Sequence, residues 1–283
     1  MNYPTIWSML TRTFAEWNRH EAPRLGAALA FYTILSLAPL VVLALAIVSL
    51  IFGNSTAQTQ LLDQVRGMIG EQGSQAVKDM IEHGQKPASS AIASIVGGIT
   101  LLFGASGVFG ELRSALNRMW DVQPESDGGF WTTIKQRVFS FTLVLAVGFL
   151  LLVSLLLSVA LAALSKFFAA VLPLPSFLLN TINLAVSQAG VAVLFALMFR
   201  YVPATKIAWR SIWIGATVTA VLFTMGKFLI GLYLGKAAVG SAYGAAGSLV
   251  VVIVWVYYSA MIFLFGAEFT QVLDSSAPAQ PKL

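Results

Sequence analysis

The sequence predicts an all-α membrane protein that crosses a bilayer six times. Only 10% of its 283 residues are charged and 58% are hydrophobic, whereas soluble domains carry about 25% charged residues. Apolar runs longer than about 18 residues recur along the chain, and runs of this length are typical of transmembrane helices. We therefore expect one polytopic helical bundle with lipid as its solvent.

Composition also excludes several kinds of site. The chain has no cysteine, so disulfide frameworks, thiolate metal sites and cysteine nucleophiles are ruled out. Its net charge is +5, but the basic residues are scattered over the loops and form no stripe of the kind that binds nucleic acid. The sequence predicts no metal, no cofactor and no nucleic-acid partner.

The N-terminal segment, residues 1–24, alternates aromatic and charged side chains. Two interpretations are open: an amphipathic helix lying at the membrane interface, or a solvated lead-in. The first apolar run, residues 25–52, is too long for a signal-peptide core, so we expect a retained first span. Pro39 lies near its middle and predicts a kink, because proline removes one helical hydrogen bond.

The long loop at residues 53–90 carries apolar side chains at helical spacing. This pattern predicts two short amphipathic helices between spans 1 and 2, on the extracytoplasmic side, with a break near the glycines at positions 70 and 73.

The remaining apolar runs are residues 91–110, 138–164, 178–199, 211–234 and 249–271. The glycines of residues 91–110 predict close helix packing, and this helix is expected to continue into the cytoplasm over residues 111–120, where charged residues begin. The two prolines in residues 167–177 predict an interfacial or re-entrant turn. Residues 25–271 thus form a single transmembrane domain, followed by a polar cytoplasmic tail, residues 272–283, that is expected to be disordered.

Charge asymmetry predicts the orientation. Eleven Lys and Arg residues fall in loops on one side of the six spans and five on the other, and the side richer in Lys and Arg faces the cytoplasm. We therefore expect a multi-pass protein of a bacterial inner membrane with both termini in the cytoplasm.

Polar residues in or next to the predicted spans are informative, because each is costly in hydrocarbon and must face protein or water. They form two groups, one near each side of the membrane. The outer group comprises Lys227, Asn180, Asn183 and Ser187. It predicts a polar cavity open to the outside, where a lysine could receive an anionic headgroup. The alternative is that Lys227 snorkels to the interface and Asn180 only caps a helix.

The inner group lies near the cytoplasmic interface and comprises Tyr32, Thr33, Ser36, Glu268, Glu111 and Arg113. Glu268 has two interpretations: a protonatable coupling site, or an ion-pair partner of Arg113 or Arg200 that pins the bundle. The glycines at positions 226, 231 and 235 are also open to two interpretations, close packing or a helix that bends.

Three segments of the chain resemble one known family. They are residues 27–39 in the first span, residues 112–120 after the second, and residues 243–247 with residues 255–257 and 265–268 around the sixth. Together they are similar to the YihY or virulence factor BrkB membrane proteins, some of which carry the older name ribonuclease BN. The resemblance implies a six-span inner-membrane protein with both ends inside, and it implies no settled biochemical activity.

A ribonuclease, or any other enzyme, is not expected from these residues. A hydrolytic nuclease needs clustered carboxylates or an acid–base histidine pair, and the two histidines, His20 and His83, are predicted on opposite sides of the membrane. The leading hypothesis is a transporter or translocase of an anionic amphipathic substrate such as a lipid or envelope precursor. The alternative is a non-transporting scaffold for envelope machinery. Membrane lipids and envelope-assembly proteins are the expected partners, and the oligomeric state is not predicted.

Overall fold

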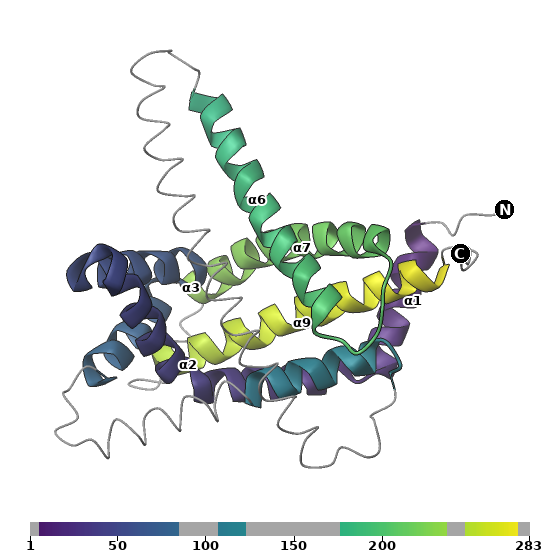
Figure 1. The fold of residues 1–283 in the computed structure, drawn as a ribbon, viewed down its shortest axis with the longest axis horizontal. Coiled ribbons are helices and arrows are strands. Elements are labelled where there is room, and N and C mark those ends of the chain that lie inside the picture. The colour runs from purple at the N-terminus through teal and green to yellow at the C-terminus, as the bar shows by residue number, and fades with distance from the viewer. Residues whose placement is uncertain (1–5, 85–106, 123–175, 237–246, 277–283) are drawn as a thin grey trace.

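The computed structural model describes residues 6–84, 107–122, 176–236 and 247–276, and their regular secondary structure is helical. The helices are α1 (Ile6–Arg19), α2 (Ala22–Phe52), α3 (Asn54–Gly84), α6 (Ser176–Tyr201), α7 (Trp209–Lys236) and α9 (Gly247–Ser276). Residues 107–119 form a further helical segment. Figure 1 shows α7 and α9 running lengthwise through the molecule, with α1 at the end where the C-terminus lies and α3 at the opposite end. The all-α fold class is confirmed for these residues.

Two described helices are long and apolar enough to cross a membrane by length and composition, within Trp209–Tyr233 and Gly247–Ser276. The shorter apolar helical stretches Ala22–Leu37 and Ser187–Tyr201 overlap two more of the predicted spans. The predicted span 138–164, most of the predicted turn at 167–177 and most of the span 91–110 lie outside the described residues. The total of six spans, and the side of the membrane on which each loop lies, therefore stay predictions.

The N-terminal segment forms an amphipathic helix, α1, and its place at the membrane interface stays a prediction. Large apolar side chains of α1 at positions 7, 10 and 14 are exposed, at the spacing of one helix face. The chain then turns at Glu21, whose backbone is left-handed at φ 56° and ψ 38°, and a proline in the first turn starts α2. Proline suits that position because the backbone N–H that it lacks would have no partner in the first turn of a helix.

α2 continues through Pro39 as one helix, and the bend expected at Pro39 stays a prediction.

The predicted break in the long loop is confirmed. α3 is interrupted at Gly70, whose backbone has φ 79° and ψ −177°, a conformation that glycine adopts without a Cβ penalty. The two halves of α3 fold back on α2, where Val41 and Leu45 pack against Val77 and Ile81.

Helices α7 and α9 pack together through two reciprocal glycine–threonine contacts. A Cβ atom at Gly215 would overlap the side chain of Thr270, and a Cβ atom at Gly266 would overlap that of Thr219. The positions run in opposite order along the two helices, so α7 and α9 are antiparallel. Each threonine hydroxyl donates to a carbonyl of its own helix, Thr219 to Gly215 at 2.6 Å and Thr270 to Gly266 at 2.7 Å. No hydroxyl proton in these contacts is left unpaired, which suits an apolar environment.

An aromatic cluster joins the other helices to this pair. Phe195 and Phe199 of α6 contact Phe263 of α9 with ring centroids 5.8 and 5.3 Å apart, and the Trp120 ring lies tilted against Phe199 with centroids 6.0 Å apart. These residues belong to one buried core that links α2, residues 107–119, α6, α7 and α9. The core brings residue 120 next to the cytoplasmic end predicted for α9.

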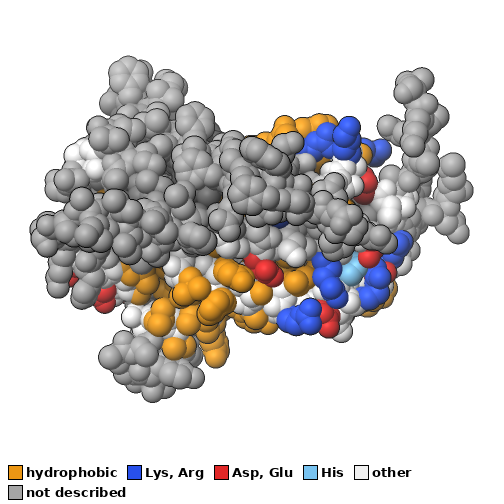
Figure 2. Space-filling view, turned by 60° about the horizontal axis from the view of Figure 1, so that its bottom comes forward, with side chains coloured by type: hydrophobic (Ala, Val, Ile, Leu, Met, Phe, Trp, Pro, Cys, Tyr) orange, Lys and Arg blue, Asp and Glu red, His pale blue; other side chains and the backbone are white. Residues whose placement is uncertain are grey.

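Basic side chains gather at one end of the face drawn in Figure 2. There Lys, Arg and a histidine lie with acidic side chains, next to a hydrophobic region, and further acidic side chains lie in the middle and at the opposite end. α9 also continues past the predicted span end at residue 271 to Ser276, so the first residues of the predicted disordered tail are helical. The reason is packing, because Val272 is fully buried.

Candidate functional site

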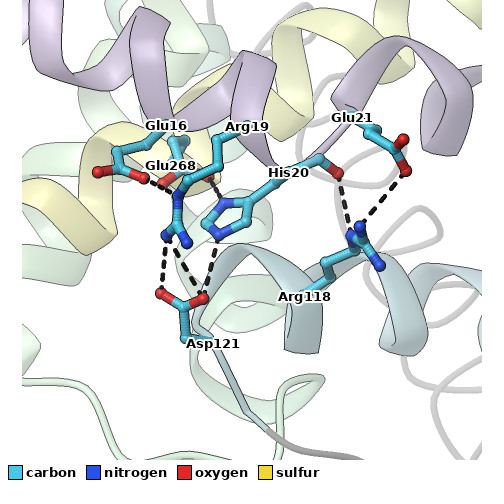
Figure 3. A network of polar contacts seen from close by, with 7 residues as sticks. All are labelled: Glu16, Arg19, His20, Glu21, Arg118, Asp121 and Glu268. Atoms are coloured by element: carbon cyan, nitrogen blue, oxygen red, sulfur yellow. Dashed lines mark hydrogen bonds and ion pairs between the residues drawn. The ribbon is translucent and has the colours of Figure 1, made fainter.

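A network of polar side chains joins three parts of the chain that are distant in sequence. It is drawn from α1, from the turn between α1 and α2, from the helical segment at residues 107–119 with the turn that follows it, and from α9 (Figure 3). Its members are Glu16, Arg19, His20, Glu21, Arg118, Asp121 and Glu268.

The centre of the network is a buried pair. The Nδ1 atom of His20 lies 2.9 Å from Oε2 of Glu268, and the exposed fractions of the two side chains are 5% and 0%. Burial of a charged or polar group costs free energy unless it is hydrogen-bonded. His20 thus supplies the hydrogen-bond partner that allows the Glu268 carboxyl group to be buried among apolar side chains. The other oxygen of Glu268, Oε1, is buried without a hydrogen-bond partner in the described structure.

The second ring nitrogen of His20 faces the surface. Its Nε2 atom lies 3.2 Å from Oδ1 of Asp121, whose side chain is 55% exposed. Arg19 also forms an ion pair with Asp121, at 3.2 Å, and with Glu16. Partial burial by itself would raise the pKa of Asp121, but the hydrogen bonds and positive charge of His20 and Arg19 outweigh it and lower that pKa below its usual value.

Arg118 fastens the α1–α2 turn to the segment that carries Asp121. Its Nε donates to the backbone carbonyl of His20 at 3.2 Å, and its Nη2 contacts the carboxylate of Glu21 at 3.3 Å. Glu21 and Asp121 are also the two non-glycine residues with positive φ in the described ranges, at 56° and 50°. Such a backbone is uncommon outside glycine, so both are held there by surrounding contacts, and strained positions of this kind cluster at functional sites.

The arrangement limits the chemistry that His20 can perform. Both of its ring nitrogens face carboxylates, so neither is left to take a proton from a nucleophile as a general base does. Among the described residues, no group of three or more His, Asp or Glu side chains is placed to hold a metal ion. A histidine between two carboxylates is instead suited to holding the bundle together or to passing a proton between the two acids.

The inner group predicted from the sequence is only partly assembled here. Glu268 belongs to the network, but its partner is His20, and Arg200 donates instead to the carbonyl of Ile207 at 2.7 Å. Ser36 is buried and donates within its own helix, to the carbonyls of Tyr32 and Thr33. Tyr32 packs over Gly107, where a Cβ atom would lie 2.9 Å from its ring. Glu111 and Arg113 are half-buried.

The outer group lies on α6 and α7. Lys227 and Ser187 are exposed. The Thr224 hydroxyl donates to the Gln188 side-chain oxygen at 2.5 Å, which brings the parts of α6 and α7 that carry Ser187 and Lys227 into contact. Asn183 and Asn180 lie within α6, which begins at Ser176, so the alternative that Asn180 caps this helix is wrong. Figure 1 shows α6 leaving α7 toward its Ser176 end.

The structure supports the packing interpretation of these glycines at one position. Gly226 is buried, and a Cβ atom there would overlap Ile262 and approach Tyr258 of α9, so the packing interpretation holds for it. Gly231 is exposed with no atom near its Cβ position.

Sequence reasoning missed the roles of His20 and Asp121. The ion-pair interpretation of Glu268 named Arg113 and Arg200 and not His20, and the pairs of His20 are formed across 101 and 248 residues of chain. One sequence signal was present: one of only two histidines directly precedes the first span, and an intramembrane glutamate needs a partner.

Comparison with known proteins places the chain in one family. The profile of the family described as Virulence factor BrkB matches residues 13–283. The chain is 31% identical to a UPF0761 membrane protein of Verminephrobacter eiseniae over 95% of its own length and 63% of the relative's. It is 30% identical to one of Albidiferax ferrireducens over 97% and 64% of the two lengths. The chain therefore spans less than two thirds of these relatives.

A shorter relative is covered almost completely. It is the protein named Putative ribonuclease-like protein YfkH of Bacillus subtilis, 26% identical over 94% of this chain and 95% of its own length. No solved structure matches the chain. With a family profile covering nearly all of its residues and relatives named as membrane proteins, the chain is an integral membrane protein of the Virulence factor BrkB family.

Proposed function

We propose that this protein is a transporter or translocase of an anionic amphipathic substrate, a lipid or an envelope precursor, in a bacterial inner membrane. The observation that carries the proposal is the position of Lys227, a cation on the exposed side of the apolar helix α7. A lysine in the middle of such a helix is costly unless it faces water or a negatively charged group.

The surroundings of Lys227 support an amphipathic partner. Met225, Phe228 and Leu229 are 57%, 67% and 55% exposed, so the cation stands among apolar side chains that suit acyl chains. The neighbouring Gly226 is packed against α9, which turns Lys227 away from the helix pair. An anionic headgroup at the ammonium group with its acyl chains on the apolar side chains fits this surface.

The network around His20 supports the predicted orientation. Arg19 and Arg118 lie with the carboxylates of the network at one end of the molecule, and the proposal places that end in the cytoplasm. On this view α1 lies at the inner interface, with the exposed Trp7 and Phe14 among lipid headgroups. The proposal assigns no enzymatic reaction, because His20 has no free ring nitrogen to act on a nucleophile.

The competing proposal is a scaffold that recruits envelope machinery through residues 111–120. One face of that helical segment is used inside the protein, because Leu112, Ala115, Leu116 and Met119 are buried in the core. This leaves less surface for a partner and favours the transport proposal.

The test uses proteoliposomes that contain a fluorescent phosphatidylglycerol, with its movement between leaflets followed by a quencher added outside. We expect the protein to accelerate the movement. Lys227→Gln should slow it at least about tenfold, the equivalent of about 1.4 kcal/mol, and Lys227→Arg should retain most of the rate because it keeps the charge. Lys206→Gln is the matched control, since Lys206 is an exposed lysine in the loop between α6 and α7.

Two outcomes decide against the proposal. If the lipid moves equally fast in vesicles without protein, or if Lys227→Gln matches Lys206→Gln, Lys227 does not receive the headgroup. Accessibility then separates transport from a scaffold. Single cysteines at positions 183, 187 and 227 of this cysteine-free chain should react with an impermeant reagent from outside if a cavity opens there, and should stay unlabelled if the protein is a solid scaffold.

A further inference from the structure

Asp121, His20 and Glu268 form a continuous chain of titratable groups from the surface into the bundle. The exposed fractions of the three side chains fall from 55% to 5% to 0%. The two links are 3.2 Å from Asp121 Oδ1 to His20 Nε2 and 2.9 Å from His20 Nδ1 to Glu268 Oε2. Figure 3 shows the imidazole between the two carboxyl groups. Both links are short enough for proton transfer.

Glu268, the innermost of the three groups, lacks a hydrogen-bond partner for one of its oxygens in the described structure. Glu268 accepts from His20 with one oxygen, and the other, Oε1, is buried without a hydrogen-bond partner in the described structure. Its neighbours Leu264 and Ala267 on α9 are fully buried apolar residues. A buried carboxylate with an oxygen that has no donor is costly if it serves packing alone. A proton on the carboxyl group removes the buried negative charge and so lowers that cost.

Several charged groups surround Asp121, His20 and Glu268. Arg19 binds Asp121 and Glu16 from α1, and Arg118 and Arg24 bind Glu21 at the start of α2. On the other helices packed here, Arg200 of α6 binds a backbone carbonyl and Arg210 of α7 is exposed. Within the part of the chain that the structure describes, the hydrogen bond to the Glu268 carboxyl group comes from His20.

We propose that Asp121 and His20 form a proton relay that loads and unloads Glu268 from the surface at which α1 and α9 meet. A proton taken from water by the Asp121 carboxylate passes to Nε2 of His20, and the proton on Nδ1 passes to Oε2 of Glu268. Asp121 ends ionised, the ring ends neutral with its proton on Nε2, and Glu268 ends as a carboxylic acid. Reversal of the two transfers returns the proton to water, so charge and protons balance in both directions.

The relay goes beyond the proposed substrate, because it concerns proton exchange by the protein itself. It would supply the proposed transporter with protons as coupling ions, but its test requires no measurement of lipid movement. A failed lipid assay and a failed relay are therefore separate results.

The test is infrared difference spectroscopy of the full chain in lipid nanodiscs after a rapid pH jump. A carboxylic acid C=O band that is absent in Glu268→Gln reports Glu268, and its rate of appearance reports the relay. We expect Asp121→Asn and His20→Gln to slow that rate at least about tenfold, in keeping with the contribution of positioned proton-transfer groups. Glu71→Gln is the control, since Glu71 is an exposed carboxylate paired with Arg66 on α3.

Each outcome is decisive. Asp121→Asn is a surface change that keeps the backbone conformation accessible, because asparagine tolerates positive φ, so it remains informative if His20→Gln does not fold. The relay is wrong if the Glu268 band appears at the wild-type rate in Asp121→Asn, or if no band assigned to Glu268 changes between about pH 4 and 9, the range over which carboxyl groups and histidine titrate in proteins. A band that slows in both relay variants but not in Glu71→Gln supports it.

Discussion

His20 and Glu268 are 248 residues apart in sequence and share a 2.9 Å hydrogen bond in the buried part of the bundle. The contact joins the turn after α1 to the last third of α9. It therefore ties the first and last described helices together at one end of the molecule.

The first prediction concerns the stability of this pair. Glu268→Met should lower the free energy of unfolding by about 3–5 kcal/mol, because it leaves a buried polar ring without its partner. The double variant His20→Leu with Glu268→Met should cost less than that single change, since replacing a buried polar pair by apolar groups is often near neutral. Unfolding in detergent, followed by tryptophan fluorescence, measures both. If the loss of stability in the double variant equals the sum of the losses from the two single changes, the two side chains do not interact.

The second prediction concerns acid stability and Asp121. Its pKa is lowered in the folded protein, so the native state binds fewer protons at acid pH than the unfolded state. The contribution is fully present above the unfolded value near 3.9 and is lost as the pH falls through the lower folded value. We expect the thermal midpoint of Asp121→Asn to depend less on pH than that of wild type below about pH 4.

The control for the acid series is Asp63→Asn. Asp63 is an exposed carboxylate paired with Arg66 on α3, distant in the fold from the network. Parallel curves for wild type and Asp121→Asn would show that His20 and Arg19 do not stabilise the ionised carboxylate.

The third prediction concerns the contact between α7 and α9. Gly215→Ala should destabilise the protein by about 1–3 kcal/mol, because the added methyl group overlaps Thr270 and forces the helices apart. Gly231→Ala on the same helix should be neutral or stabilising by up to about 1 kcal/mol, since its Cβ position is open and alanine favours helix. The thermal midpoints of the two variants in detergent test this, and similar losses at both positions would show that the close approach is not required.

Much of the local structure could be predicted without coordinates. The amphipathic helix before residue 24, the break of the long loop at Gly70 and the helices around the predicted spans 25–52, 178–199, 211–234 and 249–271 all have counterparts in the structure. Hydrophobic periodicity and glycine placement act over a few residues, so the sequence pattern carries them directly.

The candidate site was predicted far less completely. Glu268 was recognised because an acid inside an apolar run needs an explanation. Its partner was expected among arginines, yet the structure supplies a histidine from the opposite end of the chain. Arginine is the commoner partner of a buried acid, and nothing in the spacing of His20 indicates a contact across almost the whole sequence.

The sequence by itself determined the helical class, the apolar character of the helices and the positions where they break, because these depend on each residue and its near neighbours. Only the tertiary structure decided that His20 lies between Asp121 and Glu268, and that Gly215 and Gly266 face the threonines of the other helix. These contacts depend on which faces of α1, α7 and α9 meet. That choice is made by packing among side chains distant in sequence, which no local pattern records.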